Sequence, residues 1–199
     1  MTSVLFVDVE SSDLLKRGVP LDDPAQPWAV SIAAQLVIGG EDADHFHVRI
    51  TAEGRQVRPC AQAVHGISTR AAGKRGVSEI VALGMLCGFA AQAEIVVGHG
   101  IDFDRQVIEG CIRRRKKPAD LWTRPGLEFV DTMKAATPFC RIEANREDGT
   151  FKWPSLDEAC SLLLGEEPRA GVHSAWDDLA RTRRLFDWLA AKGVFEVAA

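Results

Sequence analysis

The stretch Val4-Leu5-Phe6-Val7-Asp8-Val9-Glu10, near the N-terminus of this 199-residue chain, decides how the rest of the sequence is interpreted. Its β-branched and aromatic residues form a short apolar run, which predicts a β-strand. Side chains alternate along a strand, so Asp8 and Glu10 share one face at its C-terminal end. Both faces begin with apolar residues, as in a central strand that is buried on both sides.

The two carboxylates of this strand admit two interpretations. Ligands in open α/β sheets bind beyond the carboxyl ends of the strands. Asp8 and Glu10 would repel each other there unless a divalent cation, which prefers hard oxygen ligands, lay between them. Alternatively, the strand runs out into a solvated acidic loop. The segment by itself leaves both interpretations open.

Length and composition bound the class of protein. The chain is 46% hydrophobic and 26% charged, as expected for a globular domain. Its length suits one domain, residues 1–199, with a sizeable core. No apolar run is long enough to span a membrane, and the N-terminus lacks a signal-peptide pattern. We therefore expect a cytoplasmic protein with no membrane partner.

The cysteines and the net charge exclude few classes of function. Five cysteines are spread without a CxxC pair, so we expect reduced thiols rather than disulfides or a zinc site. A net charge of −4 does not indicate a nucleic-acid-binding protein. However, an enzyme that holds its substrate partly through bound metal needs no basic surface.

The remaining pattern alternates between strands and helices. Further strands are predicted at residues 28–38, 45–50, 94–98 and 127–130, with a turn at 39–44. Helices are predicted at residues 77–92, about 101–116, 155–164 and 175–191. Residues 51–75 and 141–154 are expected to be irregular. On the strand at 45–50, His45, His47 and Arg49 would face solvent.

The first two predicted helices carry expectations about a buried face, for the helix at 77–92, and about a charged end, for the helix at 101–116. The helix at 77–92 should align one apolar face, made of Val77, Ile80, Val81, Gly84, Cys87 and Ala91. The second helix ends in the basic run 113–117, which the helix dipole favours at a C-terminus. A contact with a nucleic-acid backbone is the alternative explanation of that run.

Helical spacing singles out one of two acids at the start of the helix at 101–116. Asp104 shares a face with Val107 and Cys111, and this stripe should pack on the sheet. Asp102 lies on a polar face and is interpreted as a helix cap or a surface acid. An unpaired carboxylate at the inward position of Asp104 would be costly.

The last helix repeats the pattern. Asp178 aligns with an inward stripe that includes Thr182 and Leu185, whereas Asp177 aligns with Arg181 and could form a surface ion pair. His173 precedes this helix. A helix-start aspartate is often only a cap. The set of Asp8, Glu10, Asp104, Asp178 and His173, however, is what two-metal phosphoryl hydrolysis requires.

These residues also occur in a recognisable order. Asp8 and Glu10 form an Asp-x-Glu motif after an apolar strand. His99, Phe103 and Asp104 fall on a His-Asn-x-x-Phe-Asp motif.

The third motif completes a family pattern. His173, Ala175 and Asp178 match His-x-Ala-x-x-Asp, and His65-Gly66-Ile67-Ser68 matches a further segment. With all motifs in order, the chain resembles the DEDDh 3′–5′ exonucleases, the DnaQ-like branch of the ribonuclease H-like superfamily. The resemblance implies an α/β fold with a mixed five-stranded β-sheet flanked by α-helices.

The resemblance also implies a role for each acid. Asp8 would bridge two divalent cations, Mg²⁺ or Mn²⁺, with Glu10 and Asp178 completing the first metal site. Asp104 would act at the second metal through water, and His173 would be the general base. The implied partner is the 3′ end of single-stranded DNA or RNA, cleaved to nucleoside 5′-monophosphates.

Further residues would contact the substrate, namely Ser11, Ser12, His99 and Phe103. Loop packing is the alternative for His65 and His99. The sequence departs from the family at Ser11-Ser12-Asp13, where Thr-Thr-Gly is usual, at Gly100, where Asn is usual, and at Leu179. These departures leave every expected metal ligand in place. Some relatives are dimers, so a homodimer is one expected assembly.

Two other functions remain as alternatives to an exonuclease. The chain could be a catalytically silent module that binds nucleic acid or protein, although retention of all five residues argues against it. It could also be another two-metal phosphohydrolase, such as an endonuclease. The spacing from His173 to Asp178 argues against an endonuclease of the ribonuclease H type.

Overall fold

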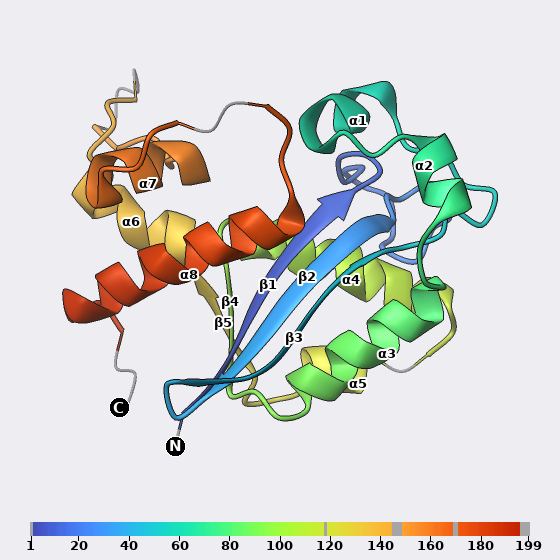
Figure 1. Ribbon diagram of the computed structural model, residues 1–199, viewed down its shortest axis with the longest axis horizontal. Coiled ribbons are helices and arrows are strands. Elements are labelled where there is room, and N and C mark those ends of the chain that lie inside the picture. Colours follow the sequence, from blue (N-terminus) through green and yellow to red (C-terminus); the bar gives the residue numbers. More distant parts are fainter. Residues whose placement is uncertain (1, 118, 145–148, 169–170, 196–199) are drawn as a thin grey trace.

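The computed structural model describes residues 2–117, 119–144, 149–168 and 171–195. A five-stranded sheet runs through the molecule in the order β3-β2-β1-β4-β5 (Figure 1). The strands are β1 (Ser3–Ser11), β2 (Ala29–Ile38), β3 (Glu41–Arg49), β4 (Ile95–Gly98) and β5 (Glu128–Asp131). The strand predicted from residues 4–10 is therefore the central one.

The sheet is mixed, as the sequence resemblance implied. β1 is antiparallel to β2, and β2 is antiparallel to β3. β4 and β5 are parallel to β1, so the C-terminal ends of these three strands meet at one edge. That edge carries Asp8 and Glu10. Gly39 and Gly40 alone connect β2 to β3, so β3 begins four residues earlier than expected.

Helices cover both faces of the sheet (Figure 1). They are α1 (Pro59–His65), α2 (Thr69–Lys74), α3 (Glu79–Ala90), α4 (Ile101–Arg114), α5 (Asp120–Thr123), α6 (Thr132–Cys140), α7 (Leu156–Leu164) and α8 (Ala175–Ala191). α8 packs through Leu179 and Phe186 on Phe6 and Val97 of one face. The opposite face, which includes Leu5, packs on α3 and α4.

The bounds of α7 and α8 agree with the sequence patterns that predicted them. Ser155 and Glu158 form the capping box at the start of α7. α8 buries its inward stripe, including Thr182 and Leu185. The expected ion pair of Asp177 with Arg181 is wrong, because the buried Arg181 guanidinium pairs with Asp157 and Glu166 of the neighbouring segment.

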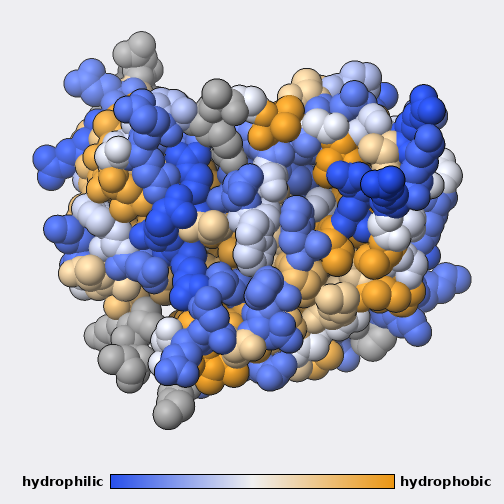
Figure 2. Space-filling model, viewed as in Figure 1, coloured by the Kyte–Doolittle hydropathy of each residue, from blue (hydrophilic) through white to orange (hydrophobic). Residues whose placement is uncertain are grey.

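α3 exposes the face that the sequence predicted to be apolar and inward. Its buried residues are Glu79, Ala82, Leu83, Leu86 and Ala90, whereas Ile80, Val81 and Met85 are exposed. Figure 2 shows this apolar surface over α3, among charged side chains. The helix is rotated because Glu79, 1% exposed, turns inward to form ion pairs.

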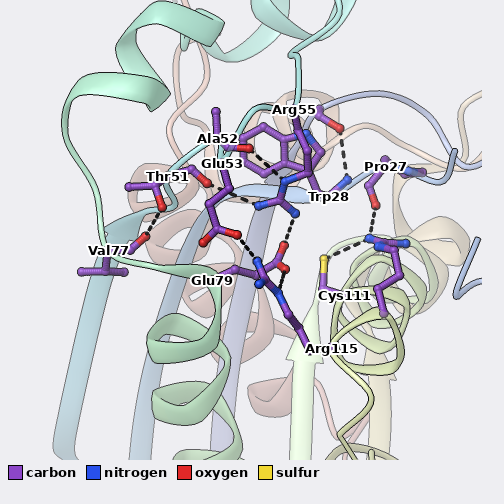
Figure 3. Close-up of polar contacts among 12 residues, drawn as sticks. Pro27, Trp28, Thr51, Ala52, Glu53, Arg55, Val77, Glu79, Cys111 and Arg115 are labelled. Atoms are coloured by element: carbon purple, nitrogen blue, oxygen red, sulfur yellow. Dashed lines mark hydrogen bonds and ion pairs between the residues drawn. The ribbon is translucent and has the colours of Figure 1, made fainter. Parts of the chain in front are cut away.

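Those ion pairs form a cluster around Glu79, drawn in Figure 3. The Glu79 carboxylate accepts hydrogen bonds from Arg55 (2.5 Å) and Arg115 (2.6 Å). Arg115 also pairs with Glu53, and the Arg55 guanidinium lies 4.3 Å from the centre of the Trp28 ring. The cluster therefore joins α3, the end of α4 and the segments that flank β2 and β3.

Contacts within the chain involve much of the basic run at residues 113–117. Arg115 bonds Glu79, and Arg114 donates to the carbonyl oxygens of Leu21 (2.8 Å) and Pro27 (2.7 Å). Arg113 pairs with Glu109 one helical turn earlier. Three of these cations thus have intramolecular partners, although the Arg113 side chain remains 54% exposed.

Four short helices, α1, α2, α5 and α6, lie where none was predicted. α1 and α2 occupy part of the expected irregular region, and Ser68 caps α2 by accepting from the Ala71 N–H (3.1 Å). α6 follows β5 directly and contains Pro138. Within the described residues, no helix is long and apolar enough to cross a membrane.

Candidate active site

Three acids meet at the C-terminal end of β1. Ligand oxygens of Asp8, Glu10 and Asp178 all lie within 4.8 Å of one another. Asp8 and Glu10 come from β1, because alternate residues of a strand share a face. Asp178 comes from the first turn of α8, which packs over that face. Glu10 and Asp178 are buried, and Asp8 is half-buried. The structure therefore brings three of the four predicted acids into one group.

Asp104 lies near this group without belonging to its tightest part. Its side chain is buried in the first turn of α4. Burial, together with the charges of Glu10, Asp131 and Asp178, raises the pKa of the Asp104 carboxyl well above its usual value. Carboxylates this close repel one another, and either binding of a proton or binding of a cation reduces the repulsion. This arrangement is what a second, more loosely held metal position would need.

His173 joins the group from the loop before α8. Its Nδ1 atom lies 3.2 Å from Oδ2 of Asp178, and the imidazole is 40% exposed. The backbone N–H of His173 donates to the Val64 carbonyl of α1 (2.9 Å). The loop is therefore anchored to α1 on one side and begins α8 on the other, which holds the imidazole at the acids.

Two pockets adjoin the acids, and Glu10 and His65 line both. The first, of about 300 Å³, is bounded mainly by apolar atoms and includes Ser11, Leu14 and Phe103. The second, of about 400 Å³ and called here the polar pocket, has a larger share of polar atoms than the first and extends to β3, with Ser31, His47, Arg49 and His173 in its lining. Glu10 thus lies between the apolar pocket and the polar pocket.

The segment His65-Gly66-Ile67-Ser68 shapes the wall between these pockets. The Ile67 N–H donates to His65 Nδ1 (3.1 Å), so the other ring nitrogen carries the proton and donates to the Ser11 carbonyl (3.2 Å). Burial lowers the pKa of His65, which agrees with a neutral ring. Gly66 has φ +73°, and a Cβ there would lie 3.3 Å from Val172.

The four expected substrate contacts fall into two pairs. Ser11 and Phe103 line the apolar pocket. Ser12 is buried, and its hydroxyl accepts from the Trp28 N–H (3.1 Å). His99 bonds Thr132 through Nδ1 (3.1 Å) and the Pro154 carbonyl through Nε2 (3.0 Å). Ser12 and His99 therefore hold the chain around the site.

The departures from the family pattern have local structural consequences. Asp13 lines the apolar pocket and lies 3.7 Å from the Arg58 guanidinium. Gly100 has φ +75° at the N-terminal cap of α4, a conformation that glycine adopts without strain. Leu179 is buried against the sheet.

The sequence interpretation missed Asp131 at the end of β5. Its Oδ1 accepts from the backbone N–H groups of Gly100 (2.8 Å) and Met133 (3.0 Å), so it anchors the start of α4 and caps α6. Its charge also raises the pKa of Asp104. The signal was present, because an acid that follows a parallel strand lies at the same edge as Asp8.

The chemistry of the donor set fits divalent cations. Carboxylate oxygens are the ligands that Mg²⁺ and Mn²⁺ prefer, and each of the three grouped residues offers a carboxylate. Three carboxylates with oxygens this close repel one another when ionised, and a cation removes that repulsion. Asp8, Glu10 and Asp178 would hold it.

The sheet order and the helices on both faces define a ribonuclease H-like fold. Solved structures of exonuclease I share it. The complex of the E. coli enzyme with a dT13 oligonucleotide is 17% identical, with a TM-score of 0.70, and the match covers 94% of this chain and 43% of that one. A product-bound exonuclease I matches at 17% identity and a TM-score of 0.72, over 96% and 43% of the two chains.

A zinc-bound complex of E. coli exonuclease I with single-stranded DNA matches at 17% identity and a TM-score of 0.67, over 96% and 43% of the chains. The present chain thus spans less than half the length of these relatives. Models of protein families and curated protein sequences gave no match. The comparison confirms the resemblance to these exonucleases at the level of the fold.

Proposed function

We propose that this chain is a metal-dependent 3′–5′ exonuclease that hydrolyses single-stranded DNA or RNA from the 3′ end. One observation carries the proposal: Asp8, Glu10 and Asp178 offer oxygens within 4.8 Å of one another, and Asp178 also contacts the His173 imidazole. A cluster of hard ligands beside a titratable base, at the carboxyl edge of a sheet, suits phosphodiester hydrolysis.

Each acid has a proposed role. Asp8 would be shared between two cations, Mg²⁺ or Mn²⁺, with Glu10 and Asp178 completing one position and Asp104 contributing to the other through water. The cations would lower the pKa of the attacking water and neutralise charge on the phosphate. The raised pKa of Asp104 supports this role, since a cation would favour its ionised form.

His173 is the proposed general base. Its Nδ1 atom contacts Asp178, so we assign proton acceptance from water to Nε2. A hydrogen bond from Nδ1 to a carboxylate fixes the tautomer in which Nε2 is the acceptor. Histidine is the most common general base in enzymes, and its free ring nitrogen can accept and release a proton in each turnover.

The apolar pocket is the proposed site of the 3′-terminal nucleoside. It adjoins Glu10, and its volume of about 300 Å³ lies within the range of small-molecule sites. Phe103 and Leu14 would contact the base and sugar, and Ser11 would lie at the polar end. The hydrolysed bond would then lie over the acids. The product that leaves the pocket would be a nucleoside 5′-monophosphate.

A catalytically silent binding module is the alternative function, and it would need no cation. Digestion of single-stranded DNA and RNA of matched sequence, labelled at either the 3′ or the 5′ end, separates the two. We expect early release of the 3′ label as mononucleotide with Mg²⁺ or Mn²⁺ and no release with chelator. Stable binding without cleavage would favour the silent module, and internal cleavage would favour an endonuclease.

Three sequence-based expectations accompany this proposal. We propose that residues 1–199 form one exonuclease domain in the cytoplasm. A homodimer is a further prediction, which light scattering of the purified chain would test.

A further inference from the structure

On the β4–β5 side of the acids, the chain carries a tryptophan that the proposed chemistry leaves unused. Trp153 is 58% exposed, although Pro154, the next residue, is buried. Single exposed apolar residues are common on protein surfaces, but an exposed indole whose neighbouring backbone is anchored beside a candidate site is available to contact a ligand. The indole is exposed although hydrogen bonds anchor the backbone of the residues on both sides of Trp153.

Two hydrogen bonds fix the backbone around Trp153. The Pro154 carbonyl accepts from His99 Nε2 (3.0 Å), and the Lys152 N–H donates to the Ile142 carbonyl (2.9 Å). His99 follows β4 and lies close enough to Asp131 and Asp178 for their charges to affect its pKa. Trp153 is thus connected to the acids through Pro154 and its hydrogen bond with His99.

The order of strands places Trp153 on a defined side of the acids. Phe6 of β1 pairs with Val97 of β4, and His99 follows the end of β4, on the side of β1 that leads to β5. On the other side of β1, Glu10 pairs with Ser31, and Ser31 pairs with Arg49 of β3. The acids therefore lie between a β3 side and a β5 side.

His173 lies on the β3 side, and this placement sets the direction of the reaction. His173 lines the polar pocket together with Ser31 and Arg49. Phosphodiester hydrolysis by in-line displacement requires the attacking water and the leaving oxygen on opposite sides of the phosphorus. With the water on the side of His173, the leaving strand departs toward the β5 side, where Trp153 lies.

From this geometry, and resting on the proposed function, we propose that Trp153 is a stacking platform for a base of the single strand upstream of the hydrolysed bond. A flat ring on this side of the acids can stack on any base, because every base has a π-face. The contact needs an unpaired base, so Trp153 would make the site select single strands over duplexes. It would also orient the strand for displacement.

The test compares Trp153→Ala, Trp153→Phe and a matched control, Leu162→Ala. Leu162 is also 58% exposed and lies on the neighbouring helix α7. Binding of a 5′-labelled dT oligonucleotide is followed by fluorescence anisotropy in an Asp8→Asn background, and digestion is followed in proteins that keep Asp8. We expect Trp153→Ala to weaken binding about 5- to 100-fold, the range for loss of one base stack, and Trp153→Phe to restore most of it.

Abasic oligonucleotides make the test specific to stacking. A single abasic position is placed second, third or fourth from the 3′ end. At one of these positions, Trp153→Ala should cause no further loss of affinity, because the stacked base is already missing. Equal losses with intact and abasic strands at all three positions, or no loss with either, would overturn the proposal.

Two further outcomes are distinguishable. If the chain binds strands through Trp153 but releases no nucleotide, the stacking proposal survives and the exonuclease proposal fails. Trp153 could instead be covered by a second copy of the chain. In that case Trp153→Ala would halve the mass measured by light scattering without weakening binding of the oligonucleotide, and the stacking proposal would be wrong.

Discussion

The Nδ1 atom of His173 lies 3.2 Å from Oδ2 of Asp178, five residues later in the chain. One residue belongs to a loop anchored to α1, and the other to the first turn of the helix that packs over β1. The contact therefore couples the orientation of a titratable imidazole to a carboxylate of the acidic cluster. Substitution of His173 is therefore expected to affect proton acceptance, and substitution of Asp178 is expected to affect cation binding as well.

Asp8→Asn should abolish release of nucleotides. The substitution removes the charge of the acid that the proposal shares between both cations, while the amide keeps the shape of the side chain. Mononucleotide release from labelled oligonucleotides measures the effect, and circular dichroism checks folding. Asp102→Asn is the matched control, since Asp102 is an exposed acid on α4 paired with Lys134. A folded Asp8→Asn protein with full metal-dependent activity would contradict the assignment.

His173→Ala should lower kcat by about 10²–10⁴-fold, the usual contribution of a general base. Cation binding should be largely preserved, because the three clustered acids are unchanged. Single-turnover digestion measures the rate, and calorimetric titration with Mn²⁺ measures cation affinity. If rate and cation affinity fall together, His173 is a metal ligand rather than the base.

Asp104 should make the stability of the cation-free protein fall as the pH rises. Burial first, and then the charges of Glu10, Asp131 and Asp178, raise the pKa of its carboxyl well above the usual 3.8. The folded chain therefore binds more protons at Asp104 than the unfolded chain does. The resulting stabilisation is complete below the unfolded pKa and is lost as the pH rises through the raised folded pKa.

Asp104→Asn removes this titration, so the cation-free variant should lose less stability between about pH 4 and neutral pH than the wild-type chain. Urea unfolding in chelator across that range measures the difference. Added Mn²⁺ should then stabilise the wild type more than the variant, because a cation favours the ionised carboxylate. Parallel pH profiles for both proteins would show that Asp104 carries no such titration.

Glu79→Gln should destabilise the fold without affecting the acids of the site. Breaking a fully buried ion pair costs about 3–5 kcal/mol. Arg55 and Arg115 are 27% and 32% exposed, so solvent screening reduces the expected loss to about 2 kcal/mol. Urea unfolding measures it. Arg113→Ala, which breaks an exposed pair with Glu109, should change stability by less than about 1 kcal/mol.

α8 and α3 illustrate how far periodicity alone can be trusted. In α8 the apolar residues form one stripe, and Asp178 is the only acid on it, so the pattern predicted both the helix bounds and the inward carboxylate. α3 has apolar residues on several sides. Its buried face was set by the pairing of Glu79 with two arginines distant in sequence, which periodicity does not encode.

The candidate site shows the same division. Asp8, Glu10, Asp104 and Asp178 were predicted because local geometry fixes which side chains share a face. Asp131 was missed although its place at the end of a parallel strand was a signal, and its hydrogen bonds to two backbone N–H groups emerge only from the packing of β5 against the start of α4. Loop packing was expected for His65 and a substrate contact for Ser12, but their hydrogen-bond partners, Ser11 and Trp28, come from other segments and could not be named in advance.

By itself, the sequence determined the central strand, the acids at its end, the helices that present Asp104 and Asp178, and the position of His173 just before the second of these helices. These features follow from interactions between residues a few positions apart, where strand and helix periods fix the direction of each side chain. Only the tertiary structure decided that the acids converge, that an apolar and a polar pocket flank Glu10, and that Trp153 lies on the β4–β5 side of the acids. Such relationships depend on packing between distant segments, and local sequence does not specify that packing.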